Sequence, residues 1–371
     1  MHKLDLVEDQ YDRQKKITWW DQETLKNSKI LIIGAGALGN EISKNLSLVG
    51  IGKITIIDND IVDLTNISRC VFFDENDIGF PKSKLLSERI SSFRNIDSNY
   101  FVSKVQDLGI GIFEDYDVVI GALDNREARS WVNEYTRMFS IPWIDGAIEG
   151  LNGLVRSFGT KGVCYECTLS EEDLKLLAIR KSCALLSEDE ITLGKVPTTA
   201  TSSSIISGFQ VQEALLYLSK QSENFMPNLG KQMTFFGETM TFVQTNLKEK
   251  KDCYVDHNNI NYQKIDISYN KKIKDIIAEG TLSENSSMFR DIITSLDCLN
   301  CGSSRNLNIY ITHAKQKDVI CNKCNTEMKI NSDRKISNFE NKTFAELSIP
   351  NLELLTSDEK YIIINNEKSK K

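Results

Sequence analysis

The chain has 371 residues, 40% of them hydrophobic and 26% charged, a balance typical of a globular protein with more than one domain. Its net charge of −7 argues against nucleic acid as the main partner. No apolar run is long enough to span a membrane, and the charged N-terminus lacks the apolar core of a signal peptide. We therefore expect a cytoplasmic protein whose nine cysteines are thiols or metal ligands rather than disulfides.

A polar segment of residues 1–28, predicted to be helical, precedes a stretch with the order strand, glycine turn, helix, strand. The first strand is Lys29–Ile33, the helix is Asn40–Val49, and the second strand is Lys53–Ile57. This order is typical of a dinucleotide-type βαβ unit. The turn contains the motif GAGALG, whose glycines are Gly34, Gly36 and Gly39.

Each glycine of this motif has a separate purpose in such a unit. Gly34 allows the tight turn, Gly36 lets backbone N–H groups approach a phosphate, and Gly39 lets the helix pack close to the strand. The amino end of the helix adds a partial positive charge. Asp58 follows the second strand, at the position where an acid can hold a ribose hydroxyl. Alone, this pattern indicates a nucleotide and favours a nicotinamide dehydrogenase.

The residues after the second strand change that interpretation. Asp58 and Asp60 form a doubled acid, the segment NISR runs from Asn66 to Arg69, and the segment GFPK ends at Lys82. A dinucleotide does not need these cations, whereas a triphosphate does, and a spare carboxylate can hold Mg²⁺. The alternative, that both cations are ordinary surface residues, explains their spacing less well.

Further strands and helices alternate after this point. Residues 84–95 are predicted to be an amphipathic helix, and residues 116–120 and 141–144 are strand candidates. The alternation predicts a Rossmann-like, doubly wound α/β sheet. Asp124 comes just after a strand, where it is expected in the ligand crevice, although it could also cap the next helix.

The cysteine pairs indicate metal binding. Cys164 and Cys167 form a CxxC, which is either half of a metal site or a redox pair, and the thioredoxin-like context of a redox pair is absent. Two further CxxC pairs have the spacing of a structural zinc ribbon, with four thiolates closing the tetrahedron. The ribbon ligands are Cys298, Cys301, Cys321 and Cys324.

Once the ribbon is complete, Cys253 and His257 are the remaining partners for the first pair. The predicted first metal site is therefore a Cys₃His set of Cys164, Cys167, Cys253 and His257. Cys183 stands alone beside Arg180 and Lys181, which could lower its pKa. From the residues alone, a buried structural cysteine is the slightly favoured alternative.

The composition shifts towards Asn, Lys, Ile and Asp near residue 258, where we place a domain boundary. Residues 1–257 are predicted to form one domain with a helical segment (1–28), a nucleotide-binding half (29–150) and a cysteine-containing, dimer-forming half (151–257). Residues 258–371 are predicted to form a smaller α+β module that contains the zinc ribbon, with a disordered end.

Together these motifs resemble the E1-like adenylating enzymes, which include the ThiF and MoeB sulfur-carrier activators and the ubiquitin-activating enzymes. The similarity covers roughly residues 8–257. It is carried by YDRQ, GAGALG, DND, NISR, GFPK, GALDN, CYEC and the segment PTTATSSSIISGFQVQEAL. The resemblance implies ATP-dependent adenylation of the C-terminal glycine of a ubiquitin-like protein, with Mg²⁺ and Zn²⁺ as cofactors.

The resemblance also implies roles for individual residues. Asp58 would hold the ribose, and Asp124 would bind Mg²⁺. Arg13 would cross from a partner protomer onto the ATP phosphates, which implies a homodimer. Cys183 stands about where the ubiquitin-type members carry the thioester cysteine. The phosphate contacts would come from Asn66, Arg69 and Lys82, beside the glycine-rich turn.

Three departures from the family pattern stand out. Cys70 follows Arg69, where a glutamine is usual, and His257 stands where many relatives carry a second CxxC. No rhodanese-like segment is visible, which weakens a persulfide-donating role. The segment 342–355 is similar to the carboxyl end of some bacterial E1-like proteins, which suggests a docking module for a carrier or an E2-like protein.

Three functions are thus expected, in order of preference. The first is activation of a ubiquitin-like protein by adenylation, followed by a thioester on Cys183 and transfer to an E2-like partner. The second is a sulfur-carrier adenylyltransferase without an essential thioester. The third is an inactive E1-like scaffold, against which the presence of Arg69, Lys82 and Asp124 argues.

Overall fold

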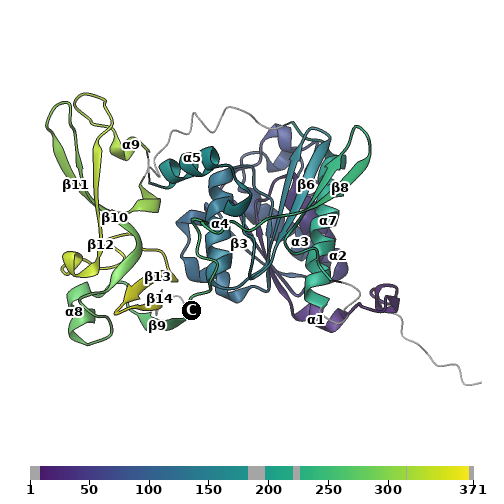
Figure 1. Ribbon diagram of the computed structural model, residues 1–371, viewed down its shortest axis with the longest axis horizontal. Coiled ribbons are helices and arrows are strands. Elements are labelled where there is room, and N and C mark those ends of the chain that lie inside the picture. The colour runs from purple at the N-terminus through teal and green to yellow at the C-terminus, as the bar shows by residue number, and fades with distance from the viewer. Residues whose placement is uncertain (1–8, 183–196, 220–225, 315, 367–371) are drawn as a thin grey trace, which may run out of the picture. The chain divides into compact units, whose positions relative to one another are not determined.

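The computed structural model describes residues 9–182, 197–219, 226–314 and 316–366. These residues divide into two compact units, each with its own sheet (Figure 1). Cys183 lies outside the described residues. The first unit takes in the described residues of 9–104, 115–168 and 197–257, and the second takes in those of 105–114, 169–182 and 258–366.

The first unit is built on an eight-stranded sheet in the order β3-β2-β1-β4-β5-β6-β7-β8. The first five strands in this order are parallel, and β6, β7 and β8 continue the sheet antiparallel. The strands are β1 (Lys29–Ile33), β2 (Lys53–Ile57), β3 (Asp97–Phe101), β4 (Val118–Gly121), β5 (Trp143–Glu149), β6 (Asn152–Phe158), β7 (Lys231–Phe236) and β8 (Thr241–Asn246).

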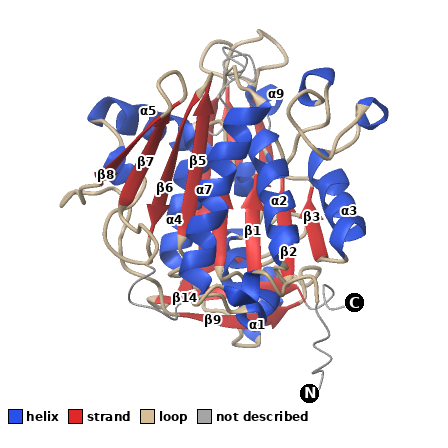
Figure 2. Cartoon of the chain, turned by 90° about the vertical axis from the view of Figure 1, so that its right-hand side faces the viewer, coloured by secondary structure: helices blue, strands red, loops and turns tan. Residues whose placement is uncertain are grey.

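Helices cover both faces of this sheet. The chain moves from β1 outwards to β3 in one direction and from β4 to β5 in the other, so right-handed crossovers place their helices on opposite faces. Figure 2 shows α2, α3 and α7 together on one face, and α7 packs against α2. The helices of this unit are α1 (Gln22–Asn27), α2 (Ala37–Val49), α3 (Lys82–Arg94), α4 (Arg126–Met138) and α7 (Ala200–Ser219).

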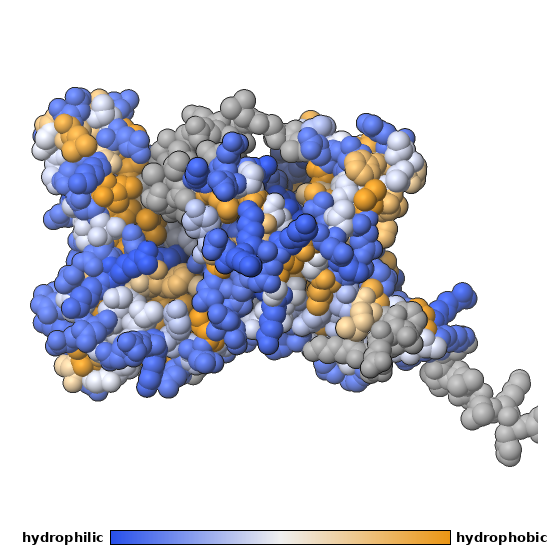
Figure 3. Space-filling view, viewed as in Figure 1, coloured by the Kyte–Doolittle hydropathy of each residue, from blue (hydrophilic) through white to orange (hydrophobic). Residues whose placement is uncertain are grey.

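The second unit is a six-stranded sheet in the order β11-β10-β13-β14-β9, with β12 also paired to β10. Figure 3 shows apolar side chains gathered beside the β10–β11 hairpin, where Leu307, Ile309 and Ile330 are partly buried. Its elements are α5 (Glu171–Ser182), β9 (Tyr262–Ile267), α8 (Ile273–Ala278), β10 (Ser287–Asp297), β11 (Ser304–Tyr310), α9 (Gln316–Val319), β12 (Lys329–Lys335), β13 (Glu353–Ser357) and β14 (Lys360–Asn366).

The connection between β3 and β4 belongs to the second unit rather than the first. Arg290 of β10 is buried, pairs with the fully buried Glu353, and donates hydrogen bonds to the carbonyls of Gln106 and Leu108. The N–H of Gly111 donates to the Leu352 carbonyl at 2.8 Å. The sequence offered no sign of this, because a buried charge pair between distant segments has no periodic signature.

The predicted doubly wound α/β sheet is confirmed. Strands β7 and β8 form an antiparallel hairpin whose turn contains Gly237. The prediction that residues 1–28 are helical is wrong for most of residues 9–28, the part that the structure describes. Between residue 9 and residue 28 only a single 3-10 turn, Gln14–Lys16, and the six-residue helix α1 form. The reason is local: Asp21 accepts hydrogen bonds from the N–H groups of Glu23 and Thr24, which starts α1 late.

A close approach between β1 and α2 fixes the glycine-rich turn. A Cβ atom added to Gly39 would lie 2.0 Å from the Gly34 carbonyl oxygen, and one added to Gly34 would lie 2.2 Å from the Ala122 carbonyl oxygen. Gly34 also has a φ of +104°, which other residues rarely adopt. A Cβ on Gly36 would meet no atom within 4 Å, so this glycine faces open space.

These distances predict different results for two glycine-to-alanine substitutions. Gly39→Ala should lower the free energy of unfolding by about 1–3 kcal/mol, the usual cost of overpacking, because a backbone carbonyl cannot move aside. Gly36→Ala, the matched control, should change it by less than about 1 kcal/mol. Urea denaturation followed by circular dichroism measures both, and equal effects would contradict the close packing of α2 on β1.

Candidate nucleotide site and metal clusters

Three chain segments meet where β1, β2 and β4 end. Gly34 N–H donates to the Ile57 carbonyl at the end of β2, and Ala122 N–H donates to the Ile33 carbonyl at the end of β1. Because the chain leaves β1 towards β2 on one side and β4 pairs on the other, the sheet opens a crevice at this edge. The glycine-rich turn therefore lies between the segment after β2 and the segment after β4.

Asp58 and Lys82 form the acidic and basic groups of this edge. Asp58 accepts the N–H of Ala35 at 2.6 Å and that of Asp60 at 2.7 Å, so its carboxylate is held against the glycine-rich turn. Burial raises the pKa of Asp58 to about 6, although the charge of Lys82 opposes the shift. Burial alone would lower the pKa of Lys82, but the charges of Asp58 and Asp60 raise it.

Lys82 is the first residue of α3 and is itself buried. Its Nζ donates to Asp60 Oδ2 at 2.9 Å. The structure thus brings Asp58, Asp60 and Lys82 together, as the motif spacing predicted. A buried lysine beside two carboxylates stays charged, which suits a site that takes an anion.

The NISR segment lies beside the same turn. Asn66 is buried, and its Oδ1 accepts the N–H of Asp63 at 3.0 Å. Arg69 is half-buried and makes no ion pair within the described part of the chain. Burial raises the pKa of Cys70 to about 11, so this thiol stays protonated at neutral pH.

Asn40 is a site residue that the sequence reasoning missed. Its side chain donates to the carbonyls of Ala35 and Gly36, at 2.9 and 3.1 Å, and accepts the N–H of Phe72 at 3.1 Å. It thereby ties the glycine-rich turn to the segment that follows NISR. The sequence held one sign of this role, a polar residue directly after the last glycine of the turn. The structure shows that its side chain is fully buried, which is unusual for an asparagine.

Asp124 is exposed at the other side of the glycine-rich turn. It does not cap α4, because Asn125 accepts the N–H of Ala128 at 2.8 Å and takes that position. Arg129 of α4 donates to the Leu123 carbonyl and so fixes the residue before Asp124. The carboxylate of Asp124 is therefore left at the crevice, with the Asn125 side chain beside it.

The fully buried carboxylate of Asp145 supports the loop that carries Asp124. Asp145 of β5 is 0% exposed and accepts hydrogen bonds from Arg129 Nε at 2.9 Å and Arg156 Nη2 at 2.6 Å. Burial by itself would lower the pKa of Arg129, but the charge of Asp145, the hydrogen bond with Asp145 and the charges of Tyr165 and Asp124 together raise it. Neither Arg129 nor Asp145 was expected from the sequence, since a buried ion pair needs the tertiary fold to bring its members together.

Arg13 lies away from the other candidate residues. It is exposed, and the neighbouring Tyr11 lies against Gly50, at the carboxyl end of α2. The glycine-rich turn is at the amino end of the same helix. Because α2 has thirteen residues, its two ends are about 20 Å apart, which is well beyond the reach of an arginine side chain.

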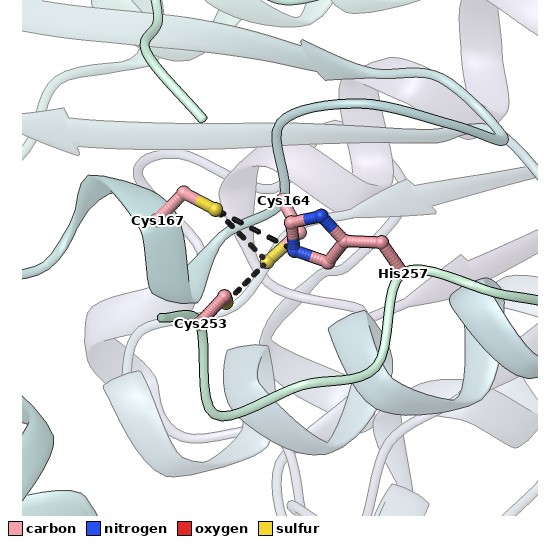
Figure 4. Close-up of side chains that lie close together, drawn as sticks. All are labelled: Cys164, Cys167, Cys253 and His257. Carbon is pink, nitrogen blue, oxygen red and sulfur yellow. Dashed lines mark hydrogen bonds between the residues drawn. The ribbon is translucent and has the colours of Figure 1, made fainter. Parts of the chain in front are cut away.

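Cys164, Cys167, Cys253 and His257 do converge (Figure 4), with ligand atoms within 4.8 Å of one another. The Cys164 sulfur is 3.7 Å from that of Cys167 and 3.5 Å from that of Cys253. Tetrahedral zinc with Zn–S bonds of about 2.3 Å separates sulfurs by about 3.7 Å. His257 Nδ1 is paired with Glu249 at 2.7 Å, which leaves Nε2 facing the thiols.

The second cluster lies at one end of the β10–β11–β12 ribbon. Cys298 and Cys301 follow β10, and Cys321 and Cys324 precede β12, so antiparallel pairing brings the two pairs together. A hydrogen bond with Ser303 is the main cause that lowers the pKa of Cys321 to about 5. Both donor sets, Cys₃His and Cys₄, are suited to zinc.

Comparison with known proteins identifies the family. A family model described as the ThiF family matches residues 11–255, so the chain belongs to the ThiF family. It is 40% identical to the NEDD8-activating enzyme E1 catalytic subunit of Schizosaccharomyces pombe over 160 residues, which are 40% of this chain and 36% of that protein. It is 34% identical to the SUMO-activating enzyme subunit 2 of Dictyostelium discoideum over 149 residues, 39% of this chain and 22% of that protein.

These matches span well under half the length of the curated relatives. Among solved structures, Escherichia coli MccB with ATP matches with a TM-score of 0.56 and 23% identity, over 68% of this chain and 75% of that one. At this identity the likeness shows the fold alone. Within the described residues, no helix is both long and apolar enough to cross a membrane.

The buried pair under the Asp124 loop predicts a stability effect. Arg129→Met should lower the free energy of unfolding by about 3 kcal/mol, because it leaves Asp145 buried with only Arg156 as an ionic partner. Arg126→Met changes an exposed arginine at the start of the same helix and serves as the control. Denaturant titration measures both, and a loss no larger than that of Arg126→Met would contradict a stabilising role of the pair.

Proposed function

We propose that the chain is an E1-type enzyme that uses Mg-ATP to adenylate the C-terminal glycine of a ubiquitin-like carrier protein. The observation that supports this most is that Asp58 and Lys82 lie together beside the glycine-rich turn, while Ala122, two residues before the exposed Asp124, packs against the same turn. Arg69 adds a cation without an ionic partner in the described chain. A dinucleotide would leave these cations without a use, whereas a triphosphate matches them.

The adenylation step follows from these groups. Asp58 accepts hydrogen bonds from the ribose, and Asn66, Arg69 and Lys82 bind the phosphates. A carboxylate oxygen of the carrier attacks the α-phosphorus, and the bond to the bridging oxygen of the β-phosphate breaks, so pyrophosphate leaves. The carrier carboxylate is already ionised and needs no general base. Mg²⁺ held by Asp124 would neutralise phosphate charge, which lowers the electrostatic cost of the step.

A second step would use Cys183. Its thiolate attacks the acyl carbon of the adenylate and AMP leaves, which forms a thioester for transfer to an E2-like partner. The support for this step is in the sequence alone: the position of Cys183 after CYECTL and the neighbouring Arg180 and Lys181. A sulfur-carrier adenylyltransferase would carry out only the first step.

The position of Arg13 supports a homodimer. It lies at the carboxyl end of α2, too far from the nucleotide site of its own chain. Arg13 can therefore contact ATP phosphates only in a second copy, as the family resemblance implies. Each protomer would complete the site of its partner.

Zinc fits both cysteine clusters. The sulfur separations of the Cys₃His set match tetrahedral coordination, and the Glu249 contact holds the His257 ring with Nε2 towards the thiols. The Cys₄ set of the ribbon would close the coordination sphere and leave no position for catalysis. We assign a structural role to both ions, and the ribbon module is a candidate docking site for the carrier or the E2-like partner.

The test is carrier-dependent ATP–pyrophosphate exchange by the purified chain, with candidate ubiquitin-like proteins. Lys82→Met should reduce exchange by at least about a hundredfold, the usual loss when a donor to a developing charge is removed. Lys84→Met should leave it unchanged, because Lys84 is exposed and its one ion pair among the described residues is with Glu88 in the next turn. Non-reducing electrophoresis of the same reactions shows any thioester.

The outcomes separate the alternatives. A thiol-sensitive adduct that Cys183→Ala abolishes, with exchange retained, establishes both steps. Exchange without an adduct indicates the sulfur-carrier adenylyltransferase. Absence of exchange from a folded dimer with every carrier contradicts the proposal and favours the scaffold.

The raised pKa of Asp58 predicts that nucleotide binding depends on pH. With a pKa of about 6, the carboxylate is mostly protonated at pH 5 and mostly ionised at pH 7. Only the ionised form accepts two ribose hydrogen bonds, so affinity should rise about tenfold over this range. Titration calorimetry measures it, and Asp58→Asn corrects for titration of the nucleotide itself. An equal rise in Asp58→Asn would contradict the role of Asp58.

A further inference from the structure

Helix α4 carries a row of polar side chains that face the protein interior. Arg129, Ser130, Asn133 and Arg137 are all less than 9% exposed. Arg129, Asn133 and Arg137 are four residues apart, which places them on one side of the helix. Buried polar groups need hydrogen-bond partners, and the partners of this row lie at two separate places.

The first place is the loop that carries Asp124. Arg129 donates to the Leu123 carbonyl and to the carboxylate of Asp145, and Asn125 caps the helix. The backbone on both sides of Asp124 is therefore held by the first turn of α4. A shift of the helix would move Asp124 with it.

The second place is the turn that contains Cys164 and Cys167. Ser130 and Asn133 donate to the two carboxylate oxygens of Glu166, which is 3% exposed, and Asn133 accepts the N–H of Tyr165 at 2.8 Å. Arg137 donates to the carbonyls of Gly162, at 2.7 Å, and Val163. The last two thirds of α4 are thus bonded to residues 162–166.

A parallel connection runs through Arg156. Its guanidinium group donates to Asp145 and lies 4.9 Å from the centre of the Tyr165 ring. Trp143 packs against the same ring, with centroids 5.7 Å apart. The cysteine turn and the Asp124 loop are therefore linked twice, once through α4 and once through β5 and β6.

We propose that the Cys164–Cys167–Cys253–His257 cluster, when it binds metal, positions Asp124 through α4, with Asn133 as the main positioning residue. Without metal, the CxxC turn loses its connection through the ion to residues 249–257 and is left with weaker contacts, among them the Lys250 N–H contact with Cys167 Sγ at 3.4 Å and apolar packing with Cys253 and Val255. The buried groups of Ser130, Asn133 and Arg137 would then lose a fixed partner. Of the side-chain hydrogen bonds described above for α4, only those of its first turn would stay fixed, although Val132 and Tyr135 still pack in the core. The metal-binding cluster thus sets the geometry of the nucleotide site, although no ligand of the cluster contacts nucleotide.

The function of the coupling rests on the proposed role of Asp124 with Mg-ATP, but the coupling itself can be measured without nucleotide. Amide hydrogen exchange reports local opening of residues 122–130 directly. The full-length chain is compared with Asn133→Ala, after metal analysis shows that both proteins hold the same zinc content. Asn152→Ala is the matched control, because Asn152 also makes one side-chain bond to a backbone N–H, that of Gly237 at 2.9 Å, away from α4.

Asn133→Ala should speed exchange of residues 122–130 by at least about tenfold, because it removes two hydrogen bonds, one of them to the charged Glu166, and Asn152→Ala should not. Removal of zinc from the unmodified chain with a chelator should do the same. In calorimetry, Asn133→Ala should weaken ATP binding about tenfold with Mg²⁺ present and leave binding without added Mg²⁺ unchanged. A purely structural role for Asn133 would not produce this dependence on Mg²⁺.

Unchanged exchange of residues 122–130 in zinc-loaded Asn133→Ala and in the zinc-free chain would overturn the coupling. An equal loss of ATP affinity with and without Mg²⁺ would overturn the positioning of Asp124. If the unmodified chain binds no Mg-ATP, the proposed function fails, while the exchange result still decides the coupling. If Asn133→Ala does not fold, Ser130→Ala removes one of the two bonds to Glu166 and supports the same comparison.

Discussion

The close contact of β1 with α2 is the constraint on which the candidate site depends. Gly39 leaves room for the Gly34 carbonyl, and Gly34 leaves room for that of Ala122. These contacts bring the amino end of α2 to the edge where β2 and β4 also end. The partial positive charge of the helix, Asp58 and the Asp124 loop therefore lie around one crevice.

The site is held by buried polar groups rather than by apolar packing alone. Asn40 ties the glycine-rich turn to the segment after Arg69, and Asp145 with Arg129 supports the loop before Asp124. Buried polar groups are costly unless they are satisfied, so each of them specifies one arrangement of its neighbours. This is the property that a site for a highly charged nucleotide needs, because the geometry must survive binding of several phosphate charges.

The short motifs singled out in the sequence do lie together in the structure. Asp60 and Lys82 are 22 positions apart, yet the fold brings their side chains to 2.9 Å. The four members of each metal cluster also converge as the cysteine spacing indicated. One local error came from capping, because Asp21 starts α1 late. Capping also decided between the two interpretations of Asp124, since Asn125 is the cap of α4. Either of two neighbouring polar residues can be the N-cap of a helix, and the sequence alone does not decide which of them it is.

What the sequence by itself determined is the family and the doubly wound sheet, because these depend on periodicity and on motifs a few residues long. Only the tertiary structure decided that Tyr11, two residues before Arg13, lies against Gly50 at the opposite end of α2 from the glycine-rich turn, and that Arg129 joins Asp145 to the Leu123 carbonyl. The physical reason is that hydrogen bonds between buried groups join segments far apart in the chain. Their partners are set by how helices pack on the sheet, and that packing leaves no repeat in the sequence.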